Sequence, residues 1–455
     1  MARPDPHPPA TFLDPESPVR LRVHLDPDRD DGRRWAPFAE ARPLGGLLFG
    51  TKSLSERIED ATGLEAAGFP GAAPPGTRAG TEEEEDTAEY EIRVDPRFIP
   101  DRRIPVEAIV ARLRAGVHGP LELVTASGEV AGAAEISSTT PSSDRSATNA
   151  ASGGADPHHF VIHGALLASP WDLMEQNGDR ITRDLIDAPP ATAQPLSPLP
   201  PGVFVLGSYP VTVGEDVEVD PQVVLDTRKG PIHLADGVRV QALTRIEGPA
   251  WIGSRTRLQG GVFSNLSTGP VCRIRGEIEA SVINGWCNKA HDGYLGHAIL
   301  GRWVNLGAFT TNSDLKNTYG SVRVPLSASE TEDTGLMKIG VLLGDHVKTG
   351  IGTLLNTGTV VGAGSTLFAG GSLPPRWVPP FSWCAGEDLT AYRLDAFLTV
   401  AERAMARRDV NLSESERAAL VRLWEATHGS SGSDGKAGEG KPGDSSAGED
   451  TAASA

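Results

Sequence analysis

Residues 284–297 form the stretch in which side chains able to move protons are most concentrated. It includes His291, Tyr294 and His297, and further Asn, Thr, Asp and Lys side chains follow as far as residue 317. A neutral imidazole, with a pKa of about 6.5, can take the proton of an amine or hydroxyl that attacks a carbonyl carbon. These residue types favour acyl transfer, with His291 as the base and Tyr294, Asn305 or backbone N–H groups as donors to the oxyanion.

Two later segments carry additional binding candidates. In residues 344–350, Lys348 is a candidate contact for a phosphate of a sugar or of CoA, whereas His346 is either a second contact or an exposed histidine of the scaffold. The loop at residues 312–320, with Lys316, either closes over a bound sugar or joins neighbouring turns of the scaffold through hydrogen bonds. We expect His297 to point outward without a role.

Aliphatic residues recur at every sixth position in the chain after residue 213. The series are Val213, Val219, Leu225; then Leu234, Val240, Ile246, Ile252, Leu258; then Leu343, Thr349, Leu355, Val361, Leu367, Leu373, where Thr349 is polar. This repeat is typical of a parallel β-helix, in which each triangular coil buries one aliphatic side chain per face and turns at small residues. The repeat breaks at 264–294 and 313–338, where we expect functional loops to leave the coil.

The rest of the chain divides around this repeat. We predict a small α/β domain over 18–195, the β-helix over 202–383 and helices over 384–427 that cover its open end. Segments 1–17, 70–87, 135–157 and 428–455 are rich in Pro, Gly, Ser or Glu and are predicted to be disordered. The individual elements expected are a strand at 19–25 and helices at 54–61, 106–115, 389–407 and from a capping box at 413–416 onward.

Composition excludes several classes of protein. The chain has 52 Gly, 36 Pro and 5% aromatic residues, which argues against a helical bundle, and its net charge of −18 argues against binding to nucleic acid or to an anionic membrane. The three cysteines form no CxxC pair, so no metal site is predicted and free thiols suit the cytoplasm. We find no signal core and no transmembrane stretch, so we expect no membrane insertion.

Residues 289–296, 304–308 and 312–314 resemble the acetyltransferase half of the bacterial family of bifunctional N-acetylglucosamine-1-phosphate uridyltransferase/glucosamine-1-phosphate acetyltransferases. Over residues 18–427 the chain is still more similar to a divergent family named sugar nucleotidyltransferase. The segments that carry this second resemblance are 37–43, 170–173, 312–319, 333–335 and 344–350.

The resemblance implies a left-handed β-helix, a homotrimer, and acetyl-CoA or another acyl-CoA bound between neighbouring subunits. The residues that it implies are His291 as the base, Tyr294 and Asn305 at the reaction centre, Lys289 and Asn312 as substrate contacts, and Ala308 beside the CoA arm. Ser313 stands where the family has tyrosine, and the interval from Lys289 to His291 is one residue shorter. Specificity for an amino sugar is therefore not implied.

The N-terminal half departs further from that family. The family's Gly-rich loop, whose N–H groups bind nucleotide phosphates, does not follow Leu25. Arg42 and Lys52 are candidate contacts for a nucleotide or sugar phosphate, although they are equally well read as surface cations. No aspartate pair for Mg²⁺ is identifiable, so Mg²⁺ is expected only if nucleotidyl transfer is retained.

Three functions remain open. The first is an acyl-CoA-dependent transferase that acts on a sugar phosphate or nucleotide sugar in cell-envelope metabolism. The second is a sugar-1-phosphate nucleotidyltransferase whose β-helix serves for trimerisation. The third is a non-catalytic trimer that binds nucleotide sugars. The density of polar side chains at 284–317 favours the first.

Overall fold

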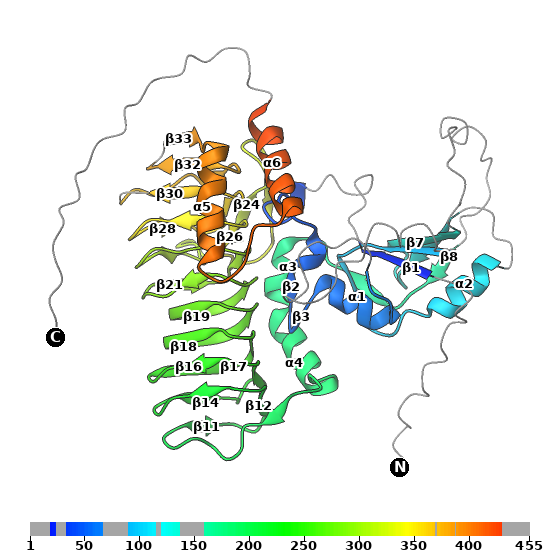
Figure 1. Cartoon of the computed structure of the whole chain (residues 1–455), viewed down its shortest axis with the longest axis horizontal. Helices are drawn as coiled ribbons and strands as arrows, with labels where there is room; N and C mark the ends of the chain where they lie inside the picture. Colours follow the sequence, from blue (N-terminus) through cyan, green and yellow to red (C-terminus); the bar gives the residue numbers. More distant parts are fainter. Residues whose placement is uncertain are drawn as a thin grey trace.

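The computed structural model describes residues 19–23, 33–66, 90–114, 120–136, 159–368, 371–386 and 388–429. An α/β region, a parallel β-helix and two terminal helices follow one another along the chain (Figure 1). The predicted fold class is therefore confirmed. The segments predicted to be disordered lie outside the described residues, apart from 135–136 and 428–429.

The N-terminal region is built on a mixed five-stranded sheet in the order β1-β4-β7-β6-β8. Its strands and helices are β1 (Val19–Val23), β4 (Tyr90–Val94), β7 (Val130–Ile136), β6 (Leu121–Val124), β8 (His159–Val161), α1 (Leu54–Thr62) and α2 (Val106–Arg114). Ile58 of α1 and Ile109 of α2 are buried with strand residues such as Ile92. Both helices lie close to their predicted bounds. α1 begins at a capping box formed by Ser53 and Glu56.

A second part of the N-terminal region packs on the β-helix. It contains 3-10 turns at Arg33–Trp35 and Leu44–Gly46, the ribbons β2 (Leu48–Phe49) with β3 (Lys52–Ser53) and β5 (Phe98–Pro100) with β9 (Gly164–Leu166), and helices α3 (Pro170–Glu175) and α4 (Asn177–Asp187). Trp35, Phe38 and Trp171 share one apolar core with coil residues. Figure 1 shows α3 and α4 running beside the coil.

The β-helix has three faces, and each face is a stack of short parallel strands. The first face holds β11 (Phe204–Leu206), β14 (Val224–Asp226), parts of β17 (Thr244–Ile252), β18 (Arg257–Thr268) and β19 (Arg273–Ile283), then β21 (Tyr294–Gly296), β23 (Thr311–Asn312) and β28 (Leu354–Leu355). The second holds β12 (Val211–Val213), with antiparallel β10 (Gln194–Pro195), then β15 (Ile232–Leu234), the ends of β17, β18 and β19, β22 (Ile299–Leu300), β26 (Val341–Leu343), β29 (Thr359–Val361) and β31 (Trp377–Val378). The third holds β13 (Glu218–Val219), β16 (Arg239–Val240), the starts of β18 and β19, β20 (Asn288–Lys289), β27 (Lys348–Thr349), β30 (Thr366–Phe368), β32 (Ser382–Ala385) and antiparallel β33 (Asp388–Ala391).

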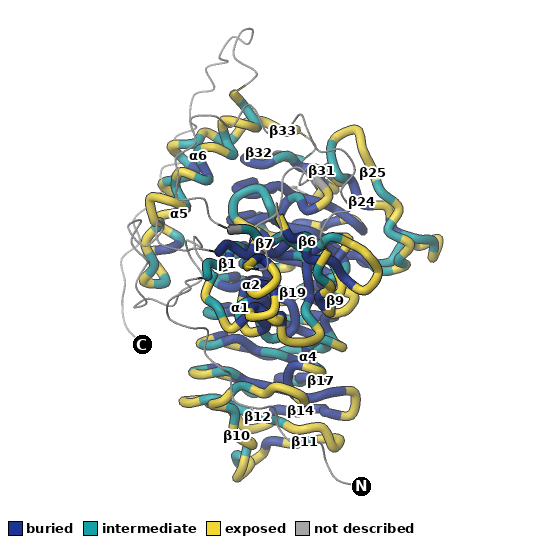
Figure 2. The backbone as a smooth tube through the Cα atoms, turned by 90° about the vertical axis from the view of Figure 1, so that its right-hand side faces the viewer, coloured by how far each residue is buried: buried dark blue, intermediate teal, exposed yellow. Residues whose placement is uncertain are grey.

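The hexapeptide series fills the interior of this coil. All five members from Leu234 to Leu258 are buried, as are those from Leu343 to Leu367 (Figure 2). Val213 and Val219 are only partly buried, at the open N-terminal end. The prediction is wrong at Leu373, which is 48% exposed, and the next inward residue is Val378.

The expected break at 264–294 is also wrong, because the coil continues through it. Leu266 pairs with Ser281 only 15 residues later, so the turns here are shorter than the 18 residues that separate Ile232 from Ala250. Gly261, with a φ of 119°, allows the tight turn, since a Cβ there would lie 2.0 Å from the carbonyl oxygen of Gly276.

The second expected break is confirmed. Ile299 pairs with Leu342, so the chain leaves the coil over residues 313–340 and rejoins it on the next turn. This excursion carries the hairpin of β24 (Arg323–Pro325) and β25 (Thr331–Asp333), which projects from the upper coils in Figure 2. Its Glu332 forms an ion pair with Arg34, at 3.0 Å.

The terminal helices are α5 (Leu394–Ala406) and α6 (Glu414–His428). The predicted capping box at Ser413 and Glu416 is present, but α5 begins five residues later than expected because residues 388–391 form β33. The helices lie along the side of the coil rather than across its open end, and Phe397 packs on Phe381, with ring centroids 4.9 Å apart (Figure 1).

Candidate functional site

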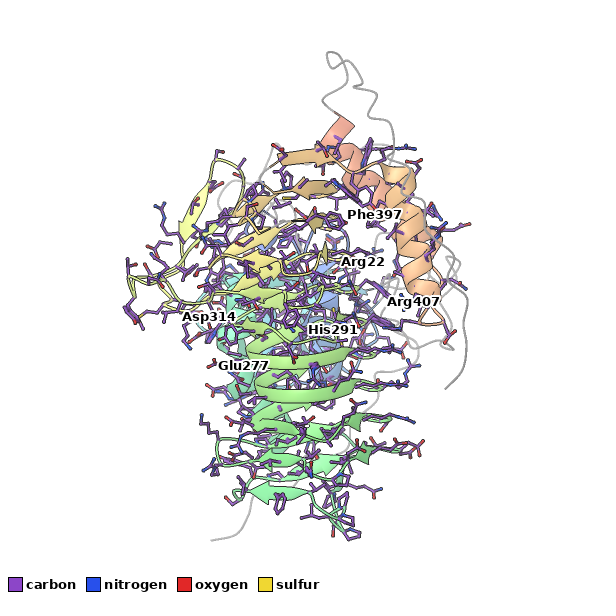
Figure 3. The ribbon with its side chains drawn as sticks, turned by 90° about the vertical axis from the view of Figure 1, so that its left-hand side faces the viewer. Arg22, Glu277, His291, Asp314, Phe397 and Arg407 are labelled. Atoms are coloured by element: carbon purple, nitrogen blue, oxygen red, sulfur yellow. The ribbon has the colours of Figure 1, made fainter. Side chains whose placement is uncertain are left out.

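His291 lies at the corner where the third face turns into the first. Gly276 and Gly293 follow Gly261 at this corner, all with positive φ, and the imidazole of His291 is exposed. Figure 3 shows His291 between Asp314 on one side and Arg407 of α5 on the other. The corner therefore joins two differently charged surfaces.

On the first-face side lies a group that we call the carboxylate–histidine cluster, formed by Glu279, Tyr294, His297 and Asp314. Asp314 Oδ2 lies 2.7 Å from His297 Nδ1 and accepts a hydrogen bond of 2.8 Å from the Tyr294 hydroxyl. The Tyr294 hydroxyl also lies 3.2 Å from Glu279 Oε2. His297 has a φ of 48°, a left-handed conformation that is uncommon outside glycine.

The hydrogen bonds of this cluster fix its charges. Burial acts to raise the pKa of Asp314, but hydrogen bonds from His297 and Tyr294 outweigh it and hold that pKa below its usual range. Burial and the two carboxylates raise the pKa of Tyr294 far above its ordinary value. Asp314 is thus a carboxylate, and Tyr294 keeps its proton.

On the other side of the corner, α5 and the third face enclose a cavity of about 340 Å³, which we call the basic cavity. Its lining includes the cations Arg273, Lys348, Arg403, Arg407 and Arg408, the indoles of Trp286 and Trp303, and the amides of Asn288 and Asn305. No carboxylate lines it among the described residues. In a chain of net charge −18, this gathering of cations favours an anionic ligand.

The cations of the basic cavity repel one another. Burial, and then Arg273 and Arg407, lower the pKa of Arg408, whose Nε is buried with no hydrogen-bond partner among the described residues. Burial lowers the pKa of Lys348 to about 8. A bound phosphate would relieve this repulsion and supply acceptors for these donors.

Two predicted residues, Asn305 and Lys348, meet in the basic cavity although 43 positions separate them. They are paired on neighbouring turns, and Asn305 Oδ1 accepts a hydrogen bond of 2.8 Å from Asn288. Ala308 lies half-buried at the same corner as His291, where its carbonyl accepts a hydrogen bond from Gly352. Among the predicted donor-binding residues only Lys348 lines the basic cavity, because Ala308 lies at the corner and His346 is buried.

His346 lies beneath α5 and does not reach the surface. Its ring stacks on Trp303 and meets the edge of Phe397, at centroid distances of 6.2 and 5.7 Å. Burial lowers its pKa to about 3, so the imidazole is neutral. His346 is therefore a buried packing residue, and neither the exposed histidine nor the ligand contact that the sequence predicts.

Lys289 points into the coil, at the level of Ile274 on the preceding turn. Its ammonium donates hydrogen bonds to the carbonyls of Arg275 and His291, at 3.1 and 2.5 Å. Instead of facing a substrate, Lys289 holds the backbone of the corner that carries His291.

Burial lowers the pKa of Lys289 to about 8 from its ordinary 10.5, which gives a testable pH dependence. Between these values the unfolded chain binds the proton and the folded chain does not, so stability rises with pH. As the pH rises from about 8 to 10.5, we expect the free energy of unfolding of the wild type to rise by about 3 kcal/mol relative to that of Lys289→Met. Urea unfolding of both proteins at several pH values measures this difference, and parallel pH curves would contradict it.

Asn312 and Lys316 differ in their placement. Asn312 lies inside the coil, where its side chain bonds to the N–H and carbonyl of Gly296, both at 3.0 Å. This is the scaffold role that the sequence left open. Lys316 lies on the excursion, and its ammonium donates to the Ser321 carbonyl at 2.7 Å.

The N-terminal candidates do not converge on one site. Arg42 Nε lies 2.7 Å from Asp345, so it joins the N-terminal region to the coil, whereas Lys52 forms an ion pair with Asp60.

Among the described residues, Glu279, His297 and Asp314 are the one set of three or more His, Cys, Asp or Glu side chains placed to hold a metal. The described N-terminal residues therefore provide no such set, and no step is assigned to Mg²⁺.

Sequence reasoning missed the arginines of the basic cavity and the carboxylate Glu279. Arg403, Arg407 and Arg408 sit at the end of a helix that we expected to be a cover, and Arg273 lies in a segment expected to loop out. Arg239 and Arg257 are one 18-residue turn apart and were an available signal, and Arg273, 16 residues further on, stacks on them on the third face.

Comparison with known proteins gives one family match in the N-terminal region and several partial matches to curated relatives. Residues 28–187 match the family described as "Sugar nucleotidyl transferase". Curated relatives named "Bifunctional protein GlmU" are 27% identical over 198 residues in Acaryochloris marina, 28% over 223 residues in Nocardia farcinica and 30% over 169 residues in Rhodococcus opacus. The chain is thus a divergent relative of such proteins.

These matches are partial on both sides. They cover 38%, 48% and 36% of this chain and 39%, 37% and 32% of the three relatives, well under two thirds of their length. A search of the described helices for one long and apolar enough to cross a membrane finds none.

Proposed function

We propose that this protein is an acyl-CoA-dependent transferase that acts on a sugar phosphate or nucleotide sugar in nucleotide-sugar and cell-envelope metabolism. The observation that carries the proposal is the basic cavity on the third face, whose Asn288 precedes the corner that carries the exposed His291. A thioester donor with phosphate groups matches the cations of the cavity, and a corner open to solvent leaves room for the acceptor.

The cavity supports binding of the donor through its charge and its shape. Arg403, Arg407 and Arg408 can bind phosphate oxygens, and Lys348 supplies a point charge on the coil. Trp286 and Trp303, stacked with centroids 5.4 Å apart, add apolar surface to the lining of the cavity. The donor would therefore lie between α5 and the third face.

His291 would act as the general base. As the acceptor oxygen or nitrogen bonds to the thioester carbonyl carbon, His291 takes its proton, and Asn305 or backbone N–H groups stabilise the oxyanion. When the intermediate collapses, the C–S bond breaks, and the thiolate leaves with the proton that His291 accepted. Tyr294 and Lys316 lie on the first-face side of the corner and on the excursion, where they could contact the acceptor.

A trimer with shared sites fits the exposed side chains of the same corner. Leu243, Phe309 and Ile351 line it and are 73%, 62% and 81% exposed. Neighbouring copies would bury these apolar residues and bring a second subunit to His291. The buried free thiols of Cys272, Cys287 and Cys384 support a reducing, cytoplasmic location.

The match of residues 28–187 favours a second candidate, transfer of a nucleotidyl group to a sugar-1-phosphate with the β-helix as the trimerisation domain. The ion pairs of Arg42 and Lys52 and the lack of a described metal-ligand set in this region weigh against it. We therefore keep it as the alternative.

The test is a parallel assay of the purified full chain. Release of free thiol from acetyl-CoA with a panel of sugar phosphates and nucleotide sugars is expected. Release of pyrophosphate from nucleoside triphosphates and sugar phosphates with Mg²⁺ would instead support nucleotidyl transfer. A thermal shift without turnover would support a binding module.

Arg407→Gln tests the location of the donor. Since a hydrogen bond to a charged group contributes about 1.5–3 kcal/mol, we expect the KM for acyl-CoA to rise about 10- to 100-fold with kcat little changed. Arg422→Gln on α6, exposed and outside the cavity, is the matched control. Equal KM values in the two variants would place the donor elsewhere.

A further inference from the structure

We propose that Glu279, His297 and Asp314 form a binding site for a divalent transition-metal ion such as Zn²⁺ on the first face of the β-helix. Their ligand atoms, one nitrogen and two carboxylate oxygens, lie within 4.8 Å of one another. Zn²⁺ binds this combination of donors, and three protein ligands leave a fourth position open. The inference does not depend on the acyl-transfer proposal.

Two of the three ligands lie on neighbouring turns of the coil, and the start of the excursion supplies the third. Glu279 lies on β19, His297 directly after β21 on the next turn, and Asp314 after β23 on the turn beyond. Stacking of the turns fixes their spacing. The left-handed φ of His297 aims its ring at Asp314, and both side chains are nearly buried, at 12% and 11% exposed.

The distances fit a small ion. Ligands about 2.0–2.1 Å from a tetrahedral zinc lie about 3.3–3.4 Å apart. The 2.7 Å between His297 Nδ1 and Asp314 Oδ2 is shorter because a shared proton joins these atoms. Replacing that proton by an ion requires these two atoms to move apart by about 0.6–0.7 Å, which the loop at Asp314 can absorb.

The charges of the carboxylate–histidine cluster also favour a divalent cation. The cluster holds two carboxylates, and Lys338, 3.7 Å from Glu279, is the nearest cation recorded for it. With a neutral His297, two carboxylates against one ammonium leave a net negative charge. A divalent cation would neutralise it.

Tyr294 defines the surroundings of the ion. Its hydroxyl donates a hydrogen bond of 2.8 Å to Asp314 and lies 3.2 Å from Glu279, so it orients these ligands rather than binding the metal. Such orienting partners typically change metal affinity about 10- to 100-fold. Water or a substrate oxygen would then occupy the fourth position, on the side where Glu279 is exposed.

The experiment titrates the metal-free full chain with Zn²⁺ and with Co²⁺. Equilibrium dialysis with elemental analysis is expected to give one ion per chain, the Co²⁺ protein to show visible d–d absorption, and the melting temperature to rise with ion concentration. His297→Gln should abolish these effects, and Tyr294→Phe should weaken binding about 10- to 100-fold. His291→Gln, a histidine outside the cluster, is the matched control and should bind as the wild type does.

Two results would overturn the site. One is wild-type protein that binds no ion beyond the amount held by His297→Gln, which would leave the cluster as a hydrogen-bonded network only. The other is equal loss of binding in His291→Gln, which would place the ion at the corner. The wild-type titration needs no variant, so a variant that fails to fold does not spoil the test. Loss of acyl transfer with intact ion binding would refute only the proposed function.

Discussion

Replacement of His291 by glutamine is expected to lower kcat of acyl transfer about 10²- to 10⁴-fold, the usual contribution of a positioned general base. Glutamine is close in size to histidine but accepts no proton near neutral pH. Because His291 is exposed and none of its side-chain contacts is recorded, folding should be unaffected. Steady-state thiol release measures the loss, and a melting curve checks that the variant is folded.

The control is His159→Gln, which changes a partly exposed histidine on β8 of the N-terminal sheet. It should turn over as the wild type does. If His291→Gln retained wild-type turnover with every accepted donor and acceptor, another group must take the proton. The basic cavity would then remain a candidate donor site without its assigned base.

Replacement of Asp184 by asparagine is expected to lower the free energy of unfolding by about 3–5 kcal/mol, because it leaves the buried guanidinium of Arg57 without its counter-charge. Asp184 accepts hydrogen bonds from Arg57 at 3.0 Å, from Arg180 at 2.8 Å and from the N–H of Thr51 at 3.0 Å. These bonds join α4 to α1 and to the β2–β3 ribbon. Denaturant unfolding measures the change, with the exposed Asp187→Asn on the same helix as control.

The effect of Asp184 should depend on pH. Burial acts to raise the pKa of its carboxyl, but bonds from Arg57 outweigh it and lower that pKa to about 2 from 3.8. Because the pKa is lower in the folded chain, ionised Asp184 adds about 2 kcal/mol to the free energy of unfolding above pH 3.8, the unfolded pKa. This contribution is lost as the pH falls through about 2. A difference between wild type and Asp184→Asn that stayed constant across this range would contradict the assignment.

The sequence predicts the β-helix well because its core imposes a strict period. Each inward position admits one aliphatic side chain, so Leu234 to Leu258 are recognisable by spacing alone. The pattern fails where the interior accepts polar residues that bond to the backbone. Lys289 and Asn312 occupy such positions, and together with the shortened turns near Gly261 they made a continuous coil look interrupted.

The candidate site is only partly predictable, because it depends on which elements meet in space. The residue types and local motifs predict His291, Asn305 and Lys348 as site residues. The arginines of α5 belong to the basic cavity only because that helix folds back along the third face, and no local pattern encodes that path. His297 was dismissed as an outward residue, since the carboxylate that holds it, Asp314, lies on the following turn.

The excursion between Asn312 and Val341 leaves one turn and re-enters at the next, so the ladders on either side, such as Asn305 with Lys348, close as though nothing intervened. The register of the coil is consequently independent of the length of this insert. The base of the insert is nevertheless anchored, because Val322 and Val324 are buried in the apolar core that the coil shares with the N-terminal region.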